Sequence, residues 1–447
     1  MKKHKQSLDI ELNSRFKKAL DLMEHTSKSV FVTGRAGTGK STLLRYFRQH
    51  TSKDVIVLAS TGVAALNVGG ETIHSFFGFK PDITLDKIKR LKGAKARSFK
   101  SINTIIIDEV SMVRADLLDC VDSFLRLNGR DPYAPFGGMQ MILIGDLYQL
   151  PPVVSFKEKE FFSRRYAGPY FFDADAFENF EMEFVELEKI YRQKSQDFIS
   201  ILNSIRNNSV GMKELSVLNS RVDKEFEKTS ESERIISLVT TNKAAYEINK
   251  AHLSRLTGSE YIYTSDIDGK FSRQAYPTDE DLFLKIGAQI MLLNNDSLGR
   301  WVNGSIGEIV NIARDLKGGR DKIMVMLSNG NLVEVLPFTW ELFHFKFDDK
   351  TNKIDSETIG SFRQYPLKLA WAITIHKSQG KTFDKVILDL GPRAFAAGQV
   401  YVALSRCVSL EGISLVRAIR KSDIIIDRRI AGFLAGLYDR QAYVLSH

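Results

Sequence analysis

Cysteine is scarce in this chain, where Cys120 and Cys407 are the only two among 447 residues. So few cysteines argue against a disulfide framework and against a zinc site. Long apolar runs are lacking as well, because no stretch approaches the roughly 18 apolar residues of a membrane span. These absences favour a soluble protein of a reducing, intracellular compartment, which is the cytoplasm if the source is bacterial.

Targeting and repeat signals are also missing. The initial residues MKKHKQSLDI are basic, but no apolar core follows them, so we expect no secretory signal. We find no internal repeat, and the length exceeds what one core supports, which predicts two to four domains. The formal charge of +9 makes a polyanionic partner a candidate. A basic soluble protein without such a partner would carry the same charge.

What is present begins with a phosphate-loop pattern at residues 30–47, VFVTGRAGTGKSTLLRYF, in the order strand, glycine-rich turn, helix. In G-x-x-x-x-G-K-S, backbone N–H groups point at phosphate oxygens, Lys40 reaches the β- and γ-phosphates, and Ser41 suits Mg²⁺. A chance glycine turn is the alternative, which the flanking strand and helix disfavour. The cofactor-binding candidates here are Gly34, Ala36, Gly37, Thr38, Gly39, Lys40, Ser41 and Thr42.

Two acids end the strand in TIIIDEVSM, residues 104–112. Asp108 and Glu109 would lie at the carboxyl edge of a parallel sheet, where open α/β sheets place their ligands. After a phosphate loop, such an aspartate helps to hold Mg²⁺, and the adjacent glutamate can take a proton from an attacking water. Two acids that merely form a turn are the alternative.

Three further side chains extend this candidate hydrolytic site. The segment MILIGDLYQLPPV, which begins at Met141, places Gln149 after a buried strand. Its amide can donate to a γ-phosphate and accept from a water. Arg192 and Arg406 lie outside the first nucleotide-binding unit, and together they could supply positive charge in a transition state. Either arginine alone would ordinarily be a surface or ion-pair residue.

Two segments are candidates for nucleic-acid contact. GGETIHSFFGF, residues 69–79, combines His74 with aromatic residues able to stack on bases. A histidine satisfied inside a core explains the same segment equally well. The run DKIKRLKGAKARSFK, residues 86–100, is strongly basic and fits a solvated helix face as well as a phosphate-binding surface.

The pattern changes in the second half of the chain, and we place a domain boundary near residue 180. From about residue 305 to 366, short alternating strands and an Asn329-Gly330 hairpin signal predict a small inserted β-barrel. Helical and parallel-strand patterns return with LAWAITIHKSQGKTF and KVILDL.

These blocks together resemble a known family. In order, GRAGTGKS, STGVAALNVGGETIHSFF, IIIDEVSM, GDLYQLPPV, YRQ, IHKSQGKTF and VYVALSRC resemble the motifs of PIF-type (petite integration frequency) DNA helicases of superfamily 1B. The resemblance spans nearly the whole chain. It implies an α/β fold of two RecA-like P-loop domains with ATP between them, a small wedge insertion and an inserted SH3-like β-barrel.

The resemblance also implies domain boundaries. The first RecA-like domain (1A) would comprise residues 1–180, with the wedge (1B) near 66–80. The second (2A) would comprise residues 181–304 and 367–447, interrupted by the SH3-like barrel (2B) at 305–366.

Residue roles follow from the same resemblance, with ATP and Mg²⁺ as cofactors. The catalytic residues would be Lys40, Asp108, Glu109, Gln149, Arg192 and Arg406, with Ser41 and Asp108 supporting the metal and Gly380 approaching the nucleotide. The DNA-binding residues would be Thr61, Gly62, His74, Asn242, Asn303, Thr374, His376 and Lys377. Two positions depart from the family. Asn13 and Phe16 occupy a region that commonly carries an adenine-reading glutamine, and we take Asn13 as a further cofactor-binding candidate. Leu147 replaces a phenylalanine.

The function implied is an ATP-dependent 5′-to-3′ DNA helicase that moves along single-stranded DNA and unwinds duplex or structured DNA. Its partners would be single strands and single-strand/duplex junctions, with G-quadruplex DNA as a further candidate. We expect no membrane partner, a monomer when free, and association with the nucleoid in a bacterium. The alternatives are a RecD-like or Dda-like translocase that displaces proteins without appreciable unwinding, and a nucleic-acid-binding protein with a vestigial ATP site.

Overall fold

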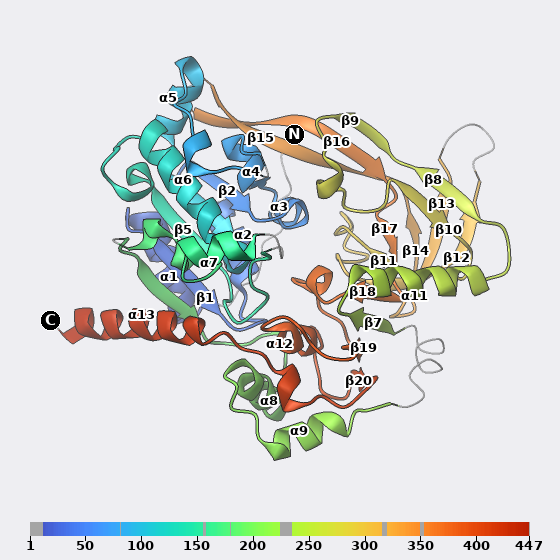
Figure 1. The fold of residues 1–447 in the computed structure, drawn as a ribbon. Coiled ribbons are helices and arrows are strands. Elements are labelled where there is room, and N and C mark those ends of the chain that lie inside the picture. The colour runs from blue at the N-terminus through green and yellow to red at the C-terminus, as the bar shows by residue number, and fades with distance from the viewer. Residues whose placement is uncertain are drawn as a thin grey trace.

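The computed structural model describes residues 12–446 except 81, 155–157, 179, 224–234, 315–319 and 349–352. Two parallel sheets form its cores (Figure 1). The first sheet has the order β3-β2-β4-β5-β1-β6, and the second has the order β18-β7-β19-β20. The first sheet and the helices packed on it are called the first unit, and the second sheet with its helices is called the second unit. A mixed α/β fold with parallel cores, as predicted, is therefore confirmed.

The first sheet consists of short apolar strands that are buried on both faces, as parallel strands covered by helices must be. They are β1 (Val30–Gly34), β2 (Val55–Ala59), β3 (Glu71–Thr72), β4 (Thr104–Asp108), β5 (Gln140–Ile144) and β6 (Glu183–Leu187). The helices of this unit are α1 (Ser14–His25), α2 (Lys40–His50), α3 (Gly62–Val68), α4 (Ile73–Phe77), α5 (Gly93–Ser101), α6 (Ala115–Asn128) and α7 (Lys159–Arg165).

The second sheet is smaller and is built from β7 (Ile236–Val239), β18 (Ala372–Thr374), β19 (Val386–Asp389) and β20 (Ile413–Leu415). Its helices are α8 (Gln196–Arg206), α9 (Met212–Asn219), α11 (Asn242–Arg255) and α12 (Gln399–Leu404). The core of this unit also holds Ala36 and Leu150 from the first unit, so the two units share an apolar seam.

Antiparallel strands follow the first part of the second unit. One sheet has the order β14-β13-β12-β11-β17, and a long hairpin of β15 and β16 pairs with β9. The strands are β8 (Tyr261–Thr264), β9 (Asp266–Gly269), β10 (Asp281–Leu284), β11 (Gln289–Leu292), β12 (Ile306–Ala313), β13 (Lys322–Leu327), β14 (Leu332–Val335), β15 (Phe338–Asp348), β16 (Lys353–Gln364) and β17 (Leu367–Leu369). The hairpin predicted at Asn329-Gly330 joins β13 to β14.

The antiparallel region begins before residue 305 and ends after residue 366, so it is longer than the predicted barrel. β11 precedes residue 305 and β17 follows residue 366, yet β11 pairs with both β12 and β17. The strands from residue 261 to 292 are short, which is why their pattern did not stand out from a helical and parallel-strand domain.

The first sheet extends beyond the boundary expected near residue 180. β6 at Glu183–Leu187 lies on the far side of that boundary and pairs with β1 along its whole length. Residues 66–80, where the wedge was expected, form α3, β3 and α4, and β3 belongs to the same sheet through its pairing with β2. A strand's own sequence does not say which sheet it joins, because pairing depends on partners far along the chain.

The last helix, α13 (Arg428–Ser446), returns to the first unit (Figure 1). Phe433 stacks on Phe172 with ring centroids 4.3 Å apart, and Leu434 and Leu437 are buried in the core of the first unit. This differs from the expectation that residues 367–447 all belong to the second unit. The chain therefore crosses the seam twice, once near Glu188 and once near Asp427.

Cutting back one of these side chains tests the packing of α13. Leu434→Ala should lower the free energy of unfolding by about 2–5 kcal/mol, because it leaves a cavity at a side chain that is only 7% exposed. Chemical denaturation measures the change, and Ala435→Gln on the exposed side of the same helix is the control. Equal stability of the two variants would mean that α13 does not complete this core.

Both cysteines are buried and neither forms a disulfide, as expected. None of the helices in the described residues combines the length and apolar character needed to cross a bilayer.

Candidate functional site

The phosphate loop joins β1 to α2 as predicted, with Gly39 in a left-handed conformation just before the helix. Gly37 has φ +81°, and a Cβ there would lie 2.6 Å from the Cβ of Arg192, so only glycine fits. Lys40 Nζ donates to the carbonyl oxygens of Gly34 at 2.6 Å and Arg35 at 3.1 Å. Burial lowers the pKa of Lys40. Its ammonium group thus lies inside the loop, and phosphate oxygens would be better partners for it than carbonyls.

The remaining loop candidates surround this lysine. Thr38 is buried and its hydroxyl donates to the Arg35 carbonyl at 2.9 Å. Ser41 and Thr42 lie in the first turn of α2, where unpaired N–H groups and the helix dipole favour anions. The Ala36 N–H donates to the Tyr401 hydroxyl at 3.0 Å, so a side chain of the second unit touches the loop.

Asp108 is the last residue of β4 and Glu109 follows it, so both lie at the carboxyl edge of the sheet. Asp108 is 7% exposed, and burial together with the charge of Glu109 raises its pKa to about 7. Glu109 has φ +50°, an unusual conformation for a residue with a side chain. Burial raises the pKa of Glu109, against the opposing charges of Lys40 and Arg406. Its Oε2 is buried without a hydrogen-bond partner among the described residues, which leaves this oxygen available to a ligand or water.

Gln149 is buried beside Asp146, which is fully buried. Gln149 Nε2 donates to Asp146 Oδ2 at 3.2 Å, which orients the amide. On its other side, Gln149 Oε1 accepts from Gln379 Nε2 of the second unit at 3.5 Å. Leu147, the departure from the family between these residues, is 1% exposed and packs in the core.

The two predicted arginines meet at the seam. Arg192 Nη1 donates to the carbonyl of Ser405 at 2.9 Å, next to Arg406. Arg406 is 1% exposed and its Nε donates to the Val402 carbonyl at 3.0 Å. Burial and the nearby charge of Arg192 lower the pKa of Arg406 to about 9, while Glu109 opposes that shift. A guanidinium of the second unit and a carboxylate of the first unit therefore belong to one electrostatic site.

Gly380 has φ +75°, and no atom lies within 4 Å of the position of a Cβ there, so a ligand has open access to it. In Asn13, by contrast, both the oxygen and the nitrogen of the side-chain amide already form hydrogen bonds within the protein. Its Oδ1 caps α1 by accepting from the Phe16 N–H at 2.9 Å, and its Nδ2 donates to the Tyr191 hydroxyl at 3.1 Å. Tyr191 is 42% exposed, and its own N–H donates to the Gly37 carbonyl. Sequence reasoning missed this aromatic, although it directly precedes Arg192.

These residues fit a nucleotide with Mg²⁺. The described residues contain no group of three His, Cys, Asp or Glu side chains that could hold a metal by themselves. Mg²⁺ at phosphate sites needs only one or two carboxylates, because phosphate oxygens and waters fill the other positions. Asp108 and Glu109 supply carboxylates of that kind, and the glycine loop and the cationic groups around it suit the phosphates.

The DNA-binding candidates of the first unit lie on its α3 and α4 side. The Thr61 hydroxyl caps α3 by accepting from the Ala64 N–H at 3.2 Å. A Cβ on Gly62 would lie 2.8 Å from Ala275, so this glycine allows close contact with the antiparallel region. His74 in α4 is partly buried, and burial lowers its pKa.

Two candidates of the second unit, Asn303 and Lys377, form a cluster with two lysines that were not predicted, Lys368 and Lys381. Asn303 Nδ2 donates to Asn67 of α3 at 3.2 Å, and Lys381 Nζ donates to Asn303 Oδ1 at 2.6 Å. The charge of Lys368 and burial lower the pKa of Lys377 to about 8. Burial and Lys368 lower the pKa of Lys381 likewise to about 8. Several ammonium groups lie close together here, and a bound anion would offset the repulsion between their charges.

Three predicted residues complete this description. Thr374 is the last residue of β18, and its hydroxyl accepts from the Lys377 N–H at 3.2 Å. Burial lowers the pKa of His376, which follows in the next turn. Asn242 is exposed at the start of α11, and within the described part of the chain it makes no contact with the lysine cluster that we can identify. A spacing pattern would not have revealed Lys368, because it lies on another strand.

Comparisons with known proteins show what this chain is similar to. The model of the PIF1-like helicase family matches residues 8–215. A relative from Bdellovibrio bacteriovorus, named ATP-dependent DNA helicase Pif1, is 33% identical over 95% of this chain and 92% of its own length. The chain spans about three fifths of the length of the vertebrate relatives it matches.

Two solved structures are similar to this chain. The crystal structure of Bacteroides sp Pif1 in complex with ADP-AlF4 is 38% identical, with a TM-score of 0.88 over 97% of this chain and 98% of that one. The crystal structure of Bacteroides Pif1 bound to ssDNA is 39% identical, with a TM-score of 0.69 over 97% and 98% of the two chains.

Proposed function

This chain belongs to the family of PIF1-like helicases, and from that premise we infer that it is an ATP-dependent DNA helicase. We propose that it moves 5′ to 3′ along single-stranded DNA. The direction rests on the family, and the observation that carries ATP-driven movement is the seam, where Lys40 and Glu109 of the first unit share one electrostatic site with Arg406 of the second. Hydrolysis at such a seam changes the contacts between two units, which is what a motor requires.

The residues of the seam divide the chemistry of ATP hydrolysis. Lys40 would bind the β- and γ-phosphates, and Glu109 would accept the proton of the attacking water. Gln149, held by Asp146, would contact the γ-phosphate and that water. Arg192 and Arg406 would offset the charge that develops on the phosphoryl oxygens. Because the γ-phosphate is contacted from both units, its loss removes the contacts that favour the closed arrangement.

Ser41 and Asp108 would hold Mg²⁺. When bound, this ion would neutralise part of the negative charge of the phosphates. Tyr191 would face the base, because it is exposed beside the phosphate loop and joined to Asn13. Asn13 itself caps α1, so we propose that stacking on Tyr191 replaces much of the base reading expected from the amino-terminal glutamine.

Single-stranded DNA would lie between α3 of the first unit and the lysine cluster of the second. Thr61, Gly62, His74, Asn242, Asn303, Thr374, His376 and Lys377 remain the proposed contacts, to which we add Lys368 and Lys381. Contacts of this kind reach phosphates and sugars, so binding would be largely independent of sequence. Single-strand/duplex junctions and G-quadruplex DNA are the proposed substrates, and a monomer is the proposed free state.

We propose the family's division of the chain, adjusted to the strands observed. The units are two RecA-like domains, supported by their parallel sheets and the phosphate loop. The antiparallel region would be the SH3-like insertion, and the region of α3, β3 and α4 would contribute the wedge. The first domain would extend through β6 and would include α13, because both pack with the first sheet.

A strand-displacement assay tests the function. Purified protein should separate a duplex that carries a 5′ single-stranded tail in the presence of ATP and Mg²⁺, and should fail on the same duplex with a 3′ tail. Hydrolysis and protein displacement without strand separation would favour the translocase. Absence of ATP turnover stimulated by single-stranded DNA would leave only a binding protein.

The lysine cluster makes DNA binding depend on pH. Lys377 and Lys381 have pKa values near 8 in the free protein, and a bound phosphate should raise them toward their ordinary value. Binding then takes up protons above pH 8, so affinity should be level below about pH 7 and should fall as pH rises through 8 to 9. Fluorescence anisotropy of a labelled oligonucleotide at constant ionic strength measures this.

Arginine variants provide the control for that titration. Lys377→Arg with Lys381→Arg should remove most of the pH dependence, because guanidinium groups stay charged across this range. Lys213→Arg lies on α9, which Figure 1 shows well away from β17 and β18, and this variant should keep the full pH dependence. A wild-type affinity that is flat from pH 7 to 9.5 would contradict the assignment of these lysines to DNA phosphates.

A further inference from the structure

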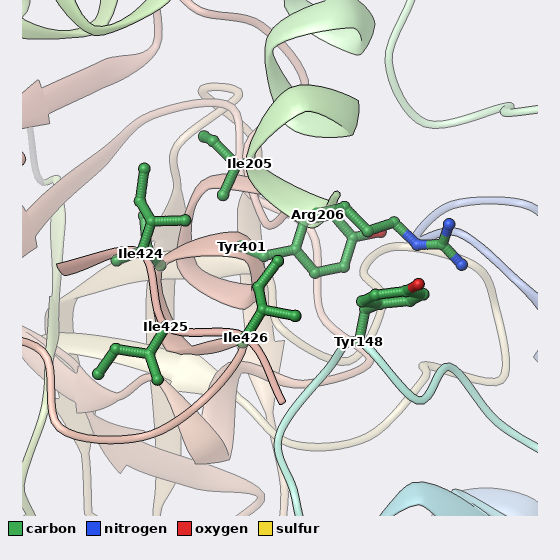
Figure 2. A pocket seen from close by; sticks show the side chains of 9 residues that line it. Tyr148, Ile205, Arg206, Tyr401, Ile424, Ile425 and Ile426 are labelled. Carbon is green, nitrogen blue, oxygen red and sulfur yellow. The ribbon is translucent and has the colours of Figure 1, made fainter. Parts of the chain in front are cut away.

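Arg206 is a buried arginine of the second unit that reaches into the first. It ends α8 and is 7% exposed, and Figure 2 shows its guanidinium extended over the ring of Tyr148, with the centroid 4.2 Å away. Its Nη2 lies 3.8 Å from Asp146 Oδ1 and 3.7 Å from Glu186 Oε1. Its Nε has no hydrogen-bond partner in the described part of the chain. The charge is therefore compensated by two carboxylates but held tightly by neither.

Asp146 connects Arg206 to the proposed nucleotide sensor. Its Oδ2 accepts from Gln149 Nε2 at 3.2 Å and from the Tyr401 hydroxyl at 3.3 Å, and its Oδ1 accepts from the Tyr148 N–H at 3.2 Å. Since Asp146 holds the Gln149 amide, any force on this carboxylate changes where the amide points. Tyr401 adds a second link, because its hydroxyl also accepts from the Ala36 N–H of the phosphate loop.

The contacts of Arg206 suit a group that shifts between two positions. Asp146 follows β5 and Glu186 lies in β6, so both carboxylates belong to the first unit while the guanidinium belongs to the second. The two distances are nearly equal, and neither is a hydrogen bond. Stacking on Tyr148 tolerates sliding, because attraction between a cation and a ring face is weakly directional. A small movement of α8 would therefore strengthen the contact with one carboxylate and weaken the other.

We propose that Arg206 is a positioning residue that transmits the placement of the second unit to Gln149 through Asp146. This inference rests on the proposed ATP hydrolysis. When the units close, Arg206 and Asp146 come to hydrogen-bond distance and the Gln149 amide is held in its working orientation. When they open, Arg206 returns toward Glu186, which also accepts a hydrogen bond from Tyr438 of α13.

Steady-state ATP turnover at saturating single-stranded DNA tests the proposal. Arg206→Gln should lower kcat at least tenfold, while the KM for ATP and the affinity for DNA change less than about twofold. Arg206→Lys keeps the charge but loses the planar stacking, so its kcat should fall between those of the wild type and Arg206→Gln. Asn207→Ala, at the exposed end of the same helix, is the control and should behave as wild type.

A double-mutant cycle separates transmission from plain destabilisation. If Arg206 acts through Gln149, then Arg206→Gln should lower kcat less than twofold further in a Gln149→Ala background. Equal loss in both backgrounds would overturn the proposal, as would a raised KM at unchanged kcat. If Arg206→Gln does not fold, Arg206→Lys takes its place in the cycle. Wild-type protein without DNA-stimulated turnover would instead refute the proposed function, and this inference with it.

Discussion

Arg192→Ala should slow ATP turnover about 10³–10⁵-fold, the range for a well-placed arginine finger. The reason is its position, since the side chain lies against Gly37 of the phosphate loop and donates to the backbone beside Arg406. From there it can reach the developing charge on a transferred phosphoryl group. Stopped assays with labelled ATP cover this range of rates.

The matched control for Arg192 is Arg164→Ala. Arg164 is an exposed arginine whose ion pair among the described residues is with Glu160 four residues earlier, so its loss should leave turnover unchanged. The affinity of Arg192→Ala for a non-hydrolysable ATP analogue should fall far less than its rate, because the arginine acts mainly on charge that develops during reaction. A loss of less than about tenfold in turnover would remove Arg192 from the catalytic set.

Glu109→Gln should lower turnover by about 10²–10⁴-fold while ATP binding persists, because an amide cannot accept the proton of the attacking water. The structure supports this residue over its neighbour, since Glu109 Oε2 is buried with no partner among the described residues. Burial also raises the pKa of Glu109, which strengthens it as a base. Because the carboxylate must be deprotonated to act, wild-type turnover should decline as pH falls through that raised pKa.

Two measurements complete the test of Glu109. Nucleotide binding by the variant can be followed through the upward shift of its melting temperature with ATP, which hydrolysis no longer depletes. Glu178→Gln, an exposed change in the same unit, should retain normal turnover. Near-normal hydrolysis by Glu109→Gln would falsify its assignment as the base and leave Asp108 as the candidate.

Local patterns in the sequence predicted the parts of the site that depend on neighbouring residues. Gly39, Lys40 and Ser41 lie in one turn between a strand and a helix, and the structure shows that order. Asp108 and Glu109 follow the predicted strand directly. In such segments the backbone path is set by adjacent residues, so spacing alone carries the information.

Other contacts had no such pattern. Asn13 was proposed from its place in the sequence, but its bond to Tyr191 comes from a residue 178 positions away. Lys381 follows Lys377 in the same turn, but Lys368 joins the two from β17 only because that strand packs beside the turn. β6 was placed beyond the first domain, although it pairs with β1. Each case depends on which surfaces pack together, and a linear pattern does not encode that choice.

The sequence by itself determined the chemistry of this protein, because a phosphate loop, two acids at a strand end and the ordered motifs each reside in short stretches whose conformation is local. Only the tertiary structure decided how the two units meet. It placed Arg206 against Asp146 and Tyr148, joined Tyr401 to the phosphate loop, and returned α13 to the first core. Those contacts join residues far apart in the chain, so complementary shape and charge after folding select them.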